Sequence, residues 1–469
     1  MEEFDLIVIG SGAGLSVASA AVDRGQTVAV VEDGPLGGTC LNRGCIPSKM
    51  LVHRADVMET IRTADRFGID ATVEHVDFAG SVHEVNEAVS EDAGGIEHGL
   101  EQSSHHTLYH TEGRFVDDRT LAVDDEEITA DTVVIAAGCR PEVPAIDGID
   151  AVEYLTSTEA LRLDRRPGSL IVVGGGYIAA ELGHYFGAFG TDVTVVGRRE
   201  RLLPDEDEQV QETFTEVFGR RHEVLTGHEA TAVERRGDRV AVTATGPDGG
   251  ETERVADELL VATGITPNTD RLAVENTGVE TDDDGYVLVD DTLATTADGV
   301  WALGDVLGRY QFRHAANHEA RTVARNLLLD GPDEAVDYTA MPHAVFASPQ
   351  VAGAGETEQA LRDADRDYAV RTYDYADTAM GDALKETDGF VKVLVDPDDR
   401  TILGCHVLGP EASTLLHEVL PVMRAGGTVA DITDTVHVHP ALSEVVHRAF
   451  AGQFHRPGGG HAHHHEHGD

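Results

Sequence analysis

The feature that most constrains the fold of this 469-residue chain is a strand, a glycine-rich turn and a helix that occur in this order twice. In the first copy, an apolar run at 4–9 precedes a glycine-rich turn at 10–14 and an Ala-rich segment at about 15–24. A second apolar run at 27–31 ends in Glu32. In a parallel βαβ unit such glycines admit a pyrophosphate to a helix N-terminus, and the acid accepts ribose hydroxyls. The copy predicts a dinucleotide site; the alternative is an ordinary tight turn.

The second copy differs from the first at the position of the acid. An apolar run at 169–173 leads into a glycine turn at 174–176, and another run follows at 192–196. A glycine then takes the place of the acid, and Arg198 and Arg199 follow it. Guanidinium groups suit a ribose 2′-phosphate, whereas an acid suits free hydroxyls. The second copy therefore predicts NADPH rather than NADH, with a solvated charge cluster as the alternative.

The length and the order of the elements predict a multidomain α/β protein. The fold class is two Rossmann-like dinucleotide-binding domains plus an α+β C-terminal domain, because the sequence becomes β-rich after about residue 338. The clearest strand-forming stretches there are 344–353 and 389–408. The predicted boundaries are 1–150 with 270–335 for the first domain, 151–269 for the second, 336–455 for the third and 456–469 for a disordered His-rich tail.

The charge balance excludes some partners. There are 85 acidic and 35 basic residues, which gives a net charge of −50 and makes nucleic acid an improbable partner. The acids are spread over the whole length, which favours a surface adapted to high intracellular salt over an acidic partner-binding patch. No apolar run approaches the ~18 residues of a membrane span, and no leader precedes the first strand. We therefore expect a cytoplasmic protein with no membrane contact.

Two of the four cysteines, Cys40 and Cys45, lie five residues apart. On an ideal helix their Cα atoms would be about 8.6 Å apart, whereas a disulfide requires less than about 7 Å. Bridging requires a distorted backbone, which Gly44 permits. A strained, reversible disulfide is a redox tool, and the alternative is two buried cysteines acting as small hydrophobes. Lys49, one of only three lysines, follows four residues after Cys45.

Two nucleotide units, the Cys-x4-Cys pair and a terminal His439-Pro440-x-Leu442-Ser443-Glu444, in one chain, resemble the class I pyridine nucleotide-disulfide oxidoreductases. The resemblance extends to about residue 454. It implies a homodimeric flavoenzyme in which the first domain binds FAD, the second binds NAD(P)H and the third is a dimerisation domain. A small-molecule disulfide is then the substrate, and the active site is shared between subunits.

The resemblance also assigns cofactor contacts. Those implied for FAD are Gly10, Gly12, Gly14, Glu32, Gly38, Thr39, Lys49, Ala137, Gly138 and Asp305. Those implied for NADPH are Gly174, Gly176, Tyr177, Ile178, Arg198, Arg199 and Gly264, with Tyr177 as a gate over the nicotinamide pocket.

The catalytic roles follow from the same resemblance. Cys45 resembles the thiol that faces the flavin, and Cys40 the thiol that attacks the substrate disulfide. Lys49 and Glu181 resemble an ion pair beside the flavin's reactive nitrogen. Thiolate is the nucleophile in such chemistry, so a nearby proton carrier is needed.

That proton carrier is identified at the C-terminal motif. His439 resembles the catalytic base and Glu444 the carboxylate that orients it, both reaching the cysteines of the partner subunit. His437, two residues earlier, has no such context and is predicted to be structural.

The substrate is predicted from the branch of the family and the surface charge. Leu15 in place of the usual third glycine and the segment 312–317 look like the mycothione reductase branch. Together with the acidic composition, they predict a halophilic archaeal reductase that converts bis-γ-glutamylcystine to γ-glutamylcysteine with NADPH. Arg43 and Arg54 are candidate contacts for substrate carboxylates.

Two other activities of the family remain as alternatives. Mercuric reductases carry a second cysteine pair near the C-terminus, whereas this chain has only Cys139 and Cys405 after Cys45. Dihydrolipoamide dehydrogenase uses NAD, which Arg198 and Arg199 disfavour. No metal site is predicted, since the His-rich tail would bind a metal only weakly.

Overall fold

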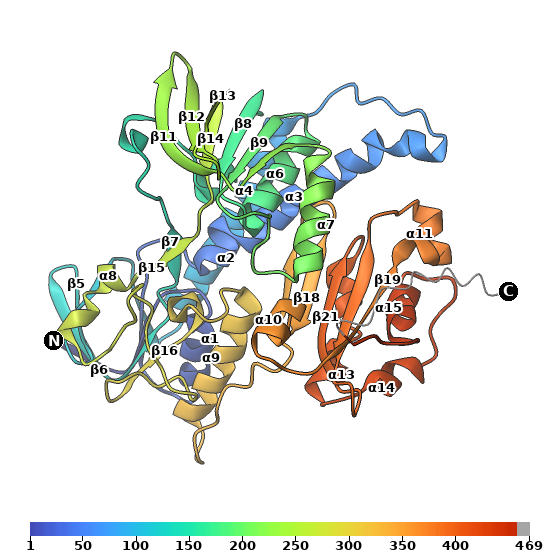
Figure 1. The fold of residues 1–469 in the computed structure, drawn as a ribbon. Helices are drawn as coiled ribbons and strands as arrows, with labels where there is room; N and C mark the ends of the chain where they lie inside the picture. The colour runs from blue at the N-terminus through green and yellow to red at the C-terminus, as the bar shows by residue number, and fades with distance from the viewer. Residues whose placement is uncertain (457–469) are drawn as a thin grey trace.

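The structure is a computed structural model that describes residues 1–456, so the predicted His-rich tail lies outside the described residues except for its first residue. It contains three main sheets (Figure 1). No helix among residues 1–456 is both long and apolar enough to cross a membrane.

The first sheet has seven strands in the order β3-β2-β1-β6-β5-β4, with β16 also paired to β6. Strands β3, β2, β1, β6 and β16 run parallel, whereas β5 and β4 are antiparallel additions. The strands are β1 (Glu2–Ile9), β2 (Val28–Val31), β3 (His106–Tyr109), β4 (Gly113–Asp117), β5 (Thr120–Val123), β6 (Glu126–Ile135) and β16 (Val300–Ala302).

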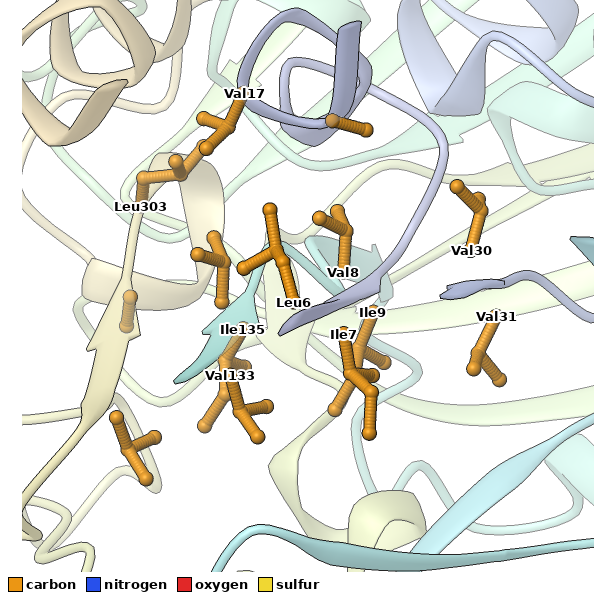
Figure 2. Packing of buried hydrophobic residues seen from close by; sticks show 14 of the residues in the cluster. Leu6, Ile7, Val8, Ile9, Val17, Val30, Val31, Val133, Ile135 and Leu303 are labelled. Carbon is orange, nitrogen blue, oxygen red and sulfur yellow. The ribbon is translucent and has the colours of Figure 1, made fainter. Parts of the chain in front are cut away.

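The first sheet is buried because its parallel strands are apolar on both faces. Figure 2 shows Ile7 and Val8 of β1 between Val30 of β2 and Val133 of β6. Helices α1 (Gly14–Val22) and α9 (Arg313–Leu328) pack against each other on this domain. The segment that carries β16 and α9 thus returns to the first domain, although it follows the second domain in the sequence.

The second domain repeats the arrangement on a smaller sheet. Its parallel order is β10-β9-β8-β14, and a separate antiparallel sheet β11-β12-β13 lies beside it. Its elements are β8 (Ser169–Val173), α6 (Tyr177–Ala188), β9 (Asp192–Gly197), α7 (Glu208–Gly219), β10 (Glu223–Thr226), β11 (Glu229–Arg236), β12 (Arg239–Thr245), β13 (Glu251–Ala256) and β14 (Glu258–Val261). Two short strands, β7 (Cys139–Pro141) and β15 (Ile265–Pro267), pair where the chain passes between the domains.

The third domain is an antiparallel sheet in the order β17-β18-β21-β20-β19, which Figure 1 shows in orange and red beside α7. The strands are β17 (Pro342–Val345), β18 (Val351–Gly355), β19 (Ala369–Asp374), β20 (Phe390–Val395) and β21 (Ile402–Leu408). Its helices are α10 (Glu358–Asp363), α11 (Ala379–Leu384), α12 (Ala412–Leu416), α13 (Leu420–Arg424), α14 (Val429–Thr433) and α15 (Ser443–Phe450). The α/β class with an α+β third domain is confirmed.

The two strand-forming stretches of the third domain are hairpins rather than single strands. The stretch 344–353 is interrupted between β17 and β18 by a turn that contains Pro349, and 389–408 is interrupted by a turn with Pro397. Proline has no N–H to donate to a strand ladder, so it marks the break in each case.

Candidate active site

The cysteine stretch forms two helices with a break between them. Helix α2 (Gly38–Arg43) carries Cys40, and α3 (Cys45–Arg62) begins at Cys45. At Gly44 a Cβ atom would lie 2.8 Å from the Thr39 carbonyl oxygen and 3.2 Å from the Cys40 Cα. Only glycine permits this approach, which brings the two thiols into hydrogen-bond contact. Both cysteines are free thiols here.

The two thiols differ in acidity. The hydrogen bond from Cys40, helped by the charge of Lys49, lowers the pKa of Cys45 to about 7 against the effect of burial. The same hydrogen bond, burial and the charge of Cys45 raise the pKa of Cys40 above its usual range. In the dithiol state, therefore, Cys45 is the thiolate and Cys40 keeps its proton.

An ion pair lies beside the cysteines. Lys49 Nζ donates to the two carboxylate oxygens of Glu181 at 2.8 and 2.7 Å, and the Glu181 side chain is 8% exposed. The Phe346 backbone N–H donates to the same carboxylate at 3.0 Å. The pair thereby joins α3, α6 and the end of β17, one element from each domain.

The first glycine turn forms a cradle for a phosphate group. Gly10 has φ +100°, and a Cβ there would lie 2.2 Å from the Ala136 carbonyl oxygen. Glu32 accepts from the Ser11 N–H at 2.9 Å and the Ser11 hydroxyl at 2.7 Å. The other predicted FAD residues that line the same cavity of about 950 Å³ are Gly12, Gly38, Thr39, Lys49, Ala137, Gly138 and Asp305.

Gly14 is the exception among these residues, because it does not line the cavity. A Cβ on Gly14 would lie 2.7 Å from Val8 Cγ1 and 2.9 Å from Ala136 Cβ. It lies in the close packing of α1 on the first sheet, and its contact with a pyrophosphate stays a prediction.

The second glycine turn opens onto the same cavity. Gly174 has φ +136°, and a Cβ there would lie 2.0 Å from the Ala262 carbonyl oxygen. The remaining predicted NADPH residues that line the cavity are Gly176, Tyr177, Ile178, Arg198, Arg199 and Gly264. One continuous cavity thus joins the two turns, as a FAD and a nicotinamide cofactor placed end to end would require.

The arginines at the second turn are available for an anion. Arg201 pairs with Glu208 at 3.1 Å. By contrast, the Arg198 and Arg199 guanidinium groups form no ion pair within residues 1–456. The residue types at both ends of the cavity therefore fit FAD and NADPH.

Asp305 lines the cavity that the two glycine turns share. It belongs to the short helix η4 (Gly304–Leu307), and burial raises the pKa of its carboxyl to about 6, with the charge of Arg313 opposing. Cys139 donates its thiol hydrogen to the Asp305 carbonyl oxygen at 3.3 Å. Cys139 belongs to β7, whereas Cys405 is buried in β21 of the third domain, and both are free thiols.

Within one chain, the pair formed by His439 and Glu444 does not reach the cysteines. Glu444 Oε1 lies 2.9 Å from His439 Nδ1, and the His439 side chain is 71% exposed. The neighbouring Val436 and Val438 are 95% and 73% exposed, so a single chain leaves these two apolar side chains uncovered. His437 instead bonds to Glu418 and to the Thr435 carbonyl oxygen, as expected of a structural residue.

The structure contains a second cavity, of about 1470 Å³, which the sequence motifs did not identify. It contains Cys40, Cys45 and Lys49 at its wall, together with Arg54. Arg43 lines the first cavity instead. Helix α9 contributes most of the remaining charge, and the only signal in the sequence was a four-residue spacing of polar side chains from 313 to 325.

Comparison with protein families gives two matches that cover nearly the whole chain. Residues 4–320 match the model described as pyridine nucleotide-disulphide oxidoreductase, and residues 341–450 match the dimerisation domain of the same group.

Individual relatives have different names at similar identity. Mycothione reductase of Mycobacterium tuberculosis is 39% identical over 96% of this chain and 100% of that protein. Dihydrolipoyl dehydrogenase of Geobacillus stearothermophilus is 35% identical over 95% of each chain. Mercuric reductase of Streptomyces lividans is 35% identical over 94% of each. A solved structure, the Cu(II) complex of the HOCl-induced flavoprotein disulfide reductase RclA from Escherichia coli, superposes with a TM-score of 0.86 at 29% identity, covering 96% of this chain and 99% of that one.

Proposed function

The chain belongs to the pyridine nucleotide-disulphide oxidoreductase family, and we propose that it is an NADPH-dependent reductase of bis-γ-glutamylcystine that acts through Cys40 and Cys45. It is an enzyme of a class that uses FAD and NAD(P)H, and its dimerisation domain supports a homodimer. The finer assignments are the substrate, the choice of NADPH and the role of each residue.

One observation carries the proposal: the Cys40–Cys45 pair lines both cavities. On one side lie the two glycine turns, and on the other lies the open cavity of about 1470 Å³. A pair of thiols in this position joins a cofactor site to a substrate site. FAD, when bound, supplies the acceptance of hydride from NADPH and the transfer of two electrons to the cysteine pair.

The chain's own residues then divide the thiol chemistry. Cys40 gives its proton to His439 of the partner subunit and, as thiolate, attacks one substrate sulfur; the substrate S–S bond breaks, and the first thiol leaves with the proton that the histidine returns. Cys45 attacks the Cys40 sulfur, which forms the Cys40–Cys45 disulfide and releases the second thiolate to be protonated. The substrate gains two electrons, and the two cysteines lose them. Glu444 holds the histidine ring through its Nδ1 atom.

The choice of NADPH rests on Arg198 and Arg199, whose guanidinium groups line the first cavity with no carboxylate partner among the described residues. The acidic composition supports a cytoplasmic enzyme of a halophilic cell, since a net charge of −50 is tolerated where salt screens self-repulsion.

The alternative of a mercuric reductase has less support. Beyond the active-site pair, Cys139 and Cys405 lie in separate domains, so no second thiol pair is present to carry mercury. No group of three or more His, Cys, Asp or Glu side chains within residues 1–456 is arranged to hold a metal ion.

The test is steady-state oxidation of NADPH and NADH with bis-γ-glutamylcystine, glutathione disulfide, lipoamide and Hg(II) as separate acceptors. We expect the highest kcat/KM with NADPH and bis-γ-glutamylcystine. Cys40→Ser should keep flavin and ferricyanide reduction but lose disulfide turnover. Full disulfide turnover by Cys40→Ser, or a higher kcat/KM with lipoamide or Hg(II), would contradict the proposal.

A further inference from the structure

Two adjacent acids, Glu206 and Asp207, lie just before helix α7 of the second domain and are both buried. Their side chains are 2% and 0% exposed. A buried carboxylate requires partners that compensate for its lost hydration. Among the described residues, the basic partners of both acids come from the third domain. Glu206 Oε2 lies 2.9 Å from His343 Nε2, and Lys392 Nζ donates to Asp207 Oδ1 at 2.7 Å. The start of α7 is therefore fixed from outside its own domain.

Lys392 is one of the three lysines of the chain and is 2% exposed, in a strand (β20) whose residues are all buried. Its ammonium group also pairs with Glu358 Oε2 at 2.5 Å. Asp207 Oδ1 accepts from the Gln209 N–H at 3.0 Å, and Asp207 Oδ2 accepts from the Glu358 N–H at 2.9 Å. One carboxylate thus binds the first turns of α7 and α10, and Lys392 neutralises it.

The side-chain amide of Gln359, on α10, adds a two-point contact to the backbone of the second domain. Its Nε2 donates to the Glu206 carbonyl oxygen at 2.7 Å, and its Oε1 accepts from the Glu208 N–H at 3.0 Å. An amide carries both the donor and the acceptor that such a contact needs. Because Gln359 is uncharged, its replacement leaves no buried ion without a partner.

The fixed end belongs to the segment 198–207, whose other end lies at the first cavity. Arg198 and Arg199 line that cavity. Between the two ends, the Leu203 N–H donates to the Gly175 carbonyl oxygen of the second glycine turn at 2.7 Å. Leu203 has φ +54°, in the left-handed region, which a leucine keeps only where its surroundings hold it there. We therefore expect the segment to relax when its contacts with the third domain are lost.

We propose that Lys392 and Gln359 of the third domain are positioning residues of the NADPH site. By holding residues 206–208, they keep Arg198 and Arg199 where the 2′-phosphate of NADPH would bind. Neither Lys392 nor Gln359 lines either of the two cavities, so both act through the segment 198–207. The inference rests on the proposed use of NADPH and goes beyond it, because it makes the affinity for the cofactor depend on the dimerisation domain.

The experiment uses the FAD-loaded dimer of Gln359→Leu, since Lys392→Met would leave Asp207 and Glu358 without a cation in the interior. Calorimetry with NADP⁺ should give a Kd roughly 5- to 30-fold higher than in the wild type, as expected when two neutral hydrogen bonds no longer hold the binding conformation. In ferricyanide reduction the KM for NADPH should rise by a similar factor, whereas kcat and flavin content should change less than about twofold. Amide hydrogen exchange should become faster in residues 198–208.

The matched control is Tyr375→Phe, which removes one hydrogen bond from the interior of the third domain. The Tyr375 side chain is buried, and its hydroxyl donates to the Pro410 carbonyl oxygen at 2.9 Å. Tyr375→Phe should lower the thermal stability but leave the Kd for NADP⁺ within about twofold of the wild type. The control thus separates a general loss of stability in the third domain from a loss of its contact with α7.

The possible failures are distinguishable. An unchanged Kd for NADP⁺ in Gln359→Leu, or an equal rise in Tyr375→Phe, would overturn the inference. A loss of flavin and kcat in Gln359→Leu as large as the rise in Kd would also overturn it, because it would show a structural role alone. A wild-type enzyme that binds NAD⁺ more tightly than NADP⁺ would instead contradict the proposed use of NADPH.

Discussion

The two cavities meet at the cysteine pair, but they differ in which parts of the chain form their walls. The cavity of about 950 Å³ has walls of backbone, where glycines at both turns let the chain approach itself closely. The cavity of about 1470 Å³ has walls of long charged side chains from several segments. The first contains two turns of the kind that bind nucleotide cofactors, whereas the second places charged side chains around the cysteine pair. Cofactor binding should thus be sensitive to backbone changes, and substrate choice to side-chain charge.

The largest effect should come from a methyl group at either glycine turn. In Gly10→Ala the Cβ would lie 2.2 Å from the Ala136 carbonyl oxygen at φ +100°, and in Gly174→Ala 2.0 Å from the Ala262 carbonyl oxygen at φ +136°. We expect Gly10→Ala to purify with at least about tenfold less flavin. Gly174→Ala should keep its flavin but lose most NADPH oxidation. Flavin absorbance per protein measures the flavin content, and ferricyanide reduction measures NADPH oxidation.

Glycines outside the cavity provide the control. Gly25→Ala faces open space, although its φ of +82° adds modest strain. This variant should keep both flavin and NADPH oxidation. Equal flavin loss in Gly10→Ala and Gly174→Ala would contradict the assignment of the first turn to FAD and the second turn to NADPH.

The next largest effect tests whether the larger cavity is completed by a second subunit. His439→Gln should lower disulfide turnover about 10²- to 10⁴-fold, the contribution of a positioned proton donor. Ferricyanide reduction, which bypasses the thiols, should be unchanged. The measurement is kcat with bis-γ-glutamylcystine and with ferricyanide.

A mixture of subunits makes the same test sharper. Cys40→Ser and His439→Gln subunits, denatured and refolded together, should form heterodimers with one intact cysteine pair opposite one intact histidine. Activity in the mixture, absent from either variant alone, is expected for a shared site. An inactive mixture that contains heterodimers would place His439 and Cys40 of one chain in the same site.

The fold and the first cavity were predictable because their signals are local. A glycine turn between two apolar runs fixes a βαβ unit within about 30 residues, and two such units gave the α/β class. Gly14 shows the limit of this reasoning. It belongs to the glycine pattern, but it serves helix packing against Val8, and a pattern alone does not separate these uses.

The second cavity was not predictable because its wall is assembled from distant segments. Arg54 was singled out for its sequence distance from Cys45, but Glu84 neutralises it. Arg321 is far from the cysteines in sequence, and only the packing of α9 brings it to their cavity. Whether a guanidinium is free or paired depends on such contacts, which no local pattern records.

A smaller effect is expected at the outer end of the first cavity. Replacing Arg198 and Arg199 together by Ala should lower kcat/KM for NADPH roughly 10- to 100-fold, since charge-assisted contacts to a phosphate are lost. The value for NADH should change less than about threefold. Arg201→Ala, whose guanidinium pairs with Glu208, is the control with little expected change. A parallel loss with both cofactors would show a structural rather than a phosphate-binding role.

The smallest effect concerns the thiols where the cavities meet. Because the pKa of Cys45 is lowered to about 7, its thiolate should appear as the pH rises through that value. In the two-electron-reduced, FAD-loaded enzyme a long-wavelength thiolate–flavin absorbance band should follow the same titration. Lys49→Met removes a charge that lowers this pKa and leaves Glu181, whose charge raises it, without its partner. The midpoint should therefore move to higher pH, with about three- to fivefold less thiolate at pH 7. Lys385→Met, remote from the cysteines, should leave the midpoint in place. An unchanged midpoint in Lys49→Met would mean that the Cys40 thiol alone sets the acidity of Cys45, and that the ion pair serves the cofactor side rather than the meeting point of the two cavities.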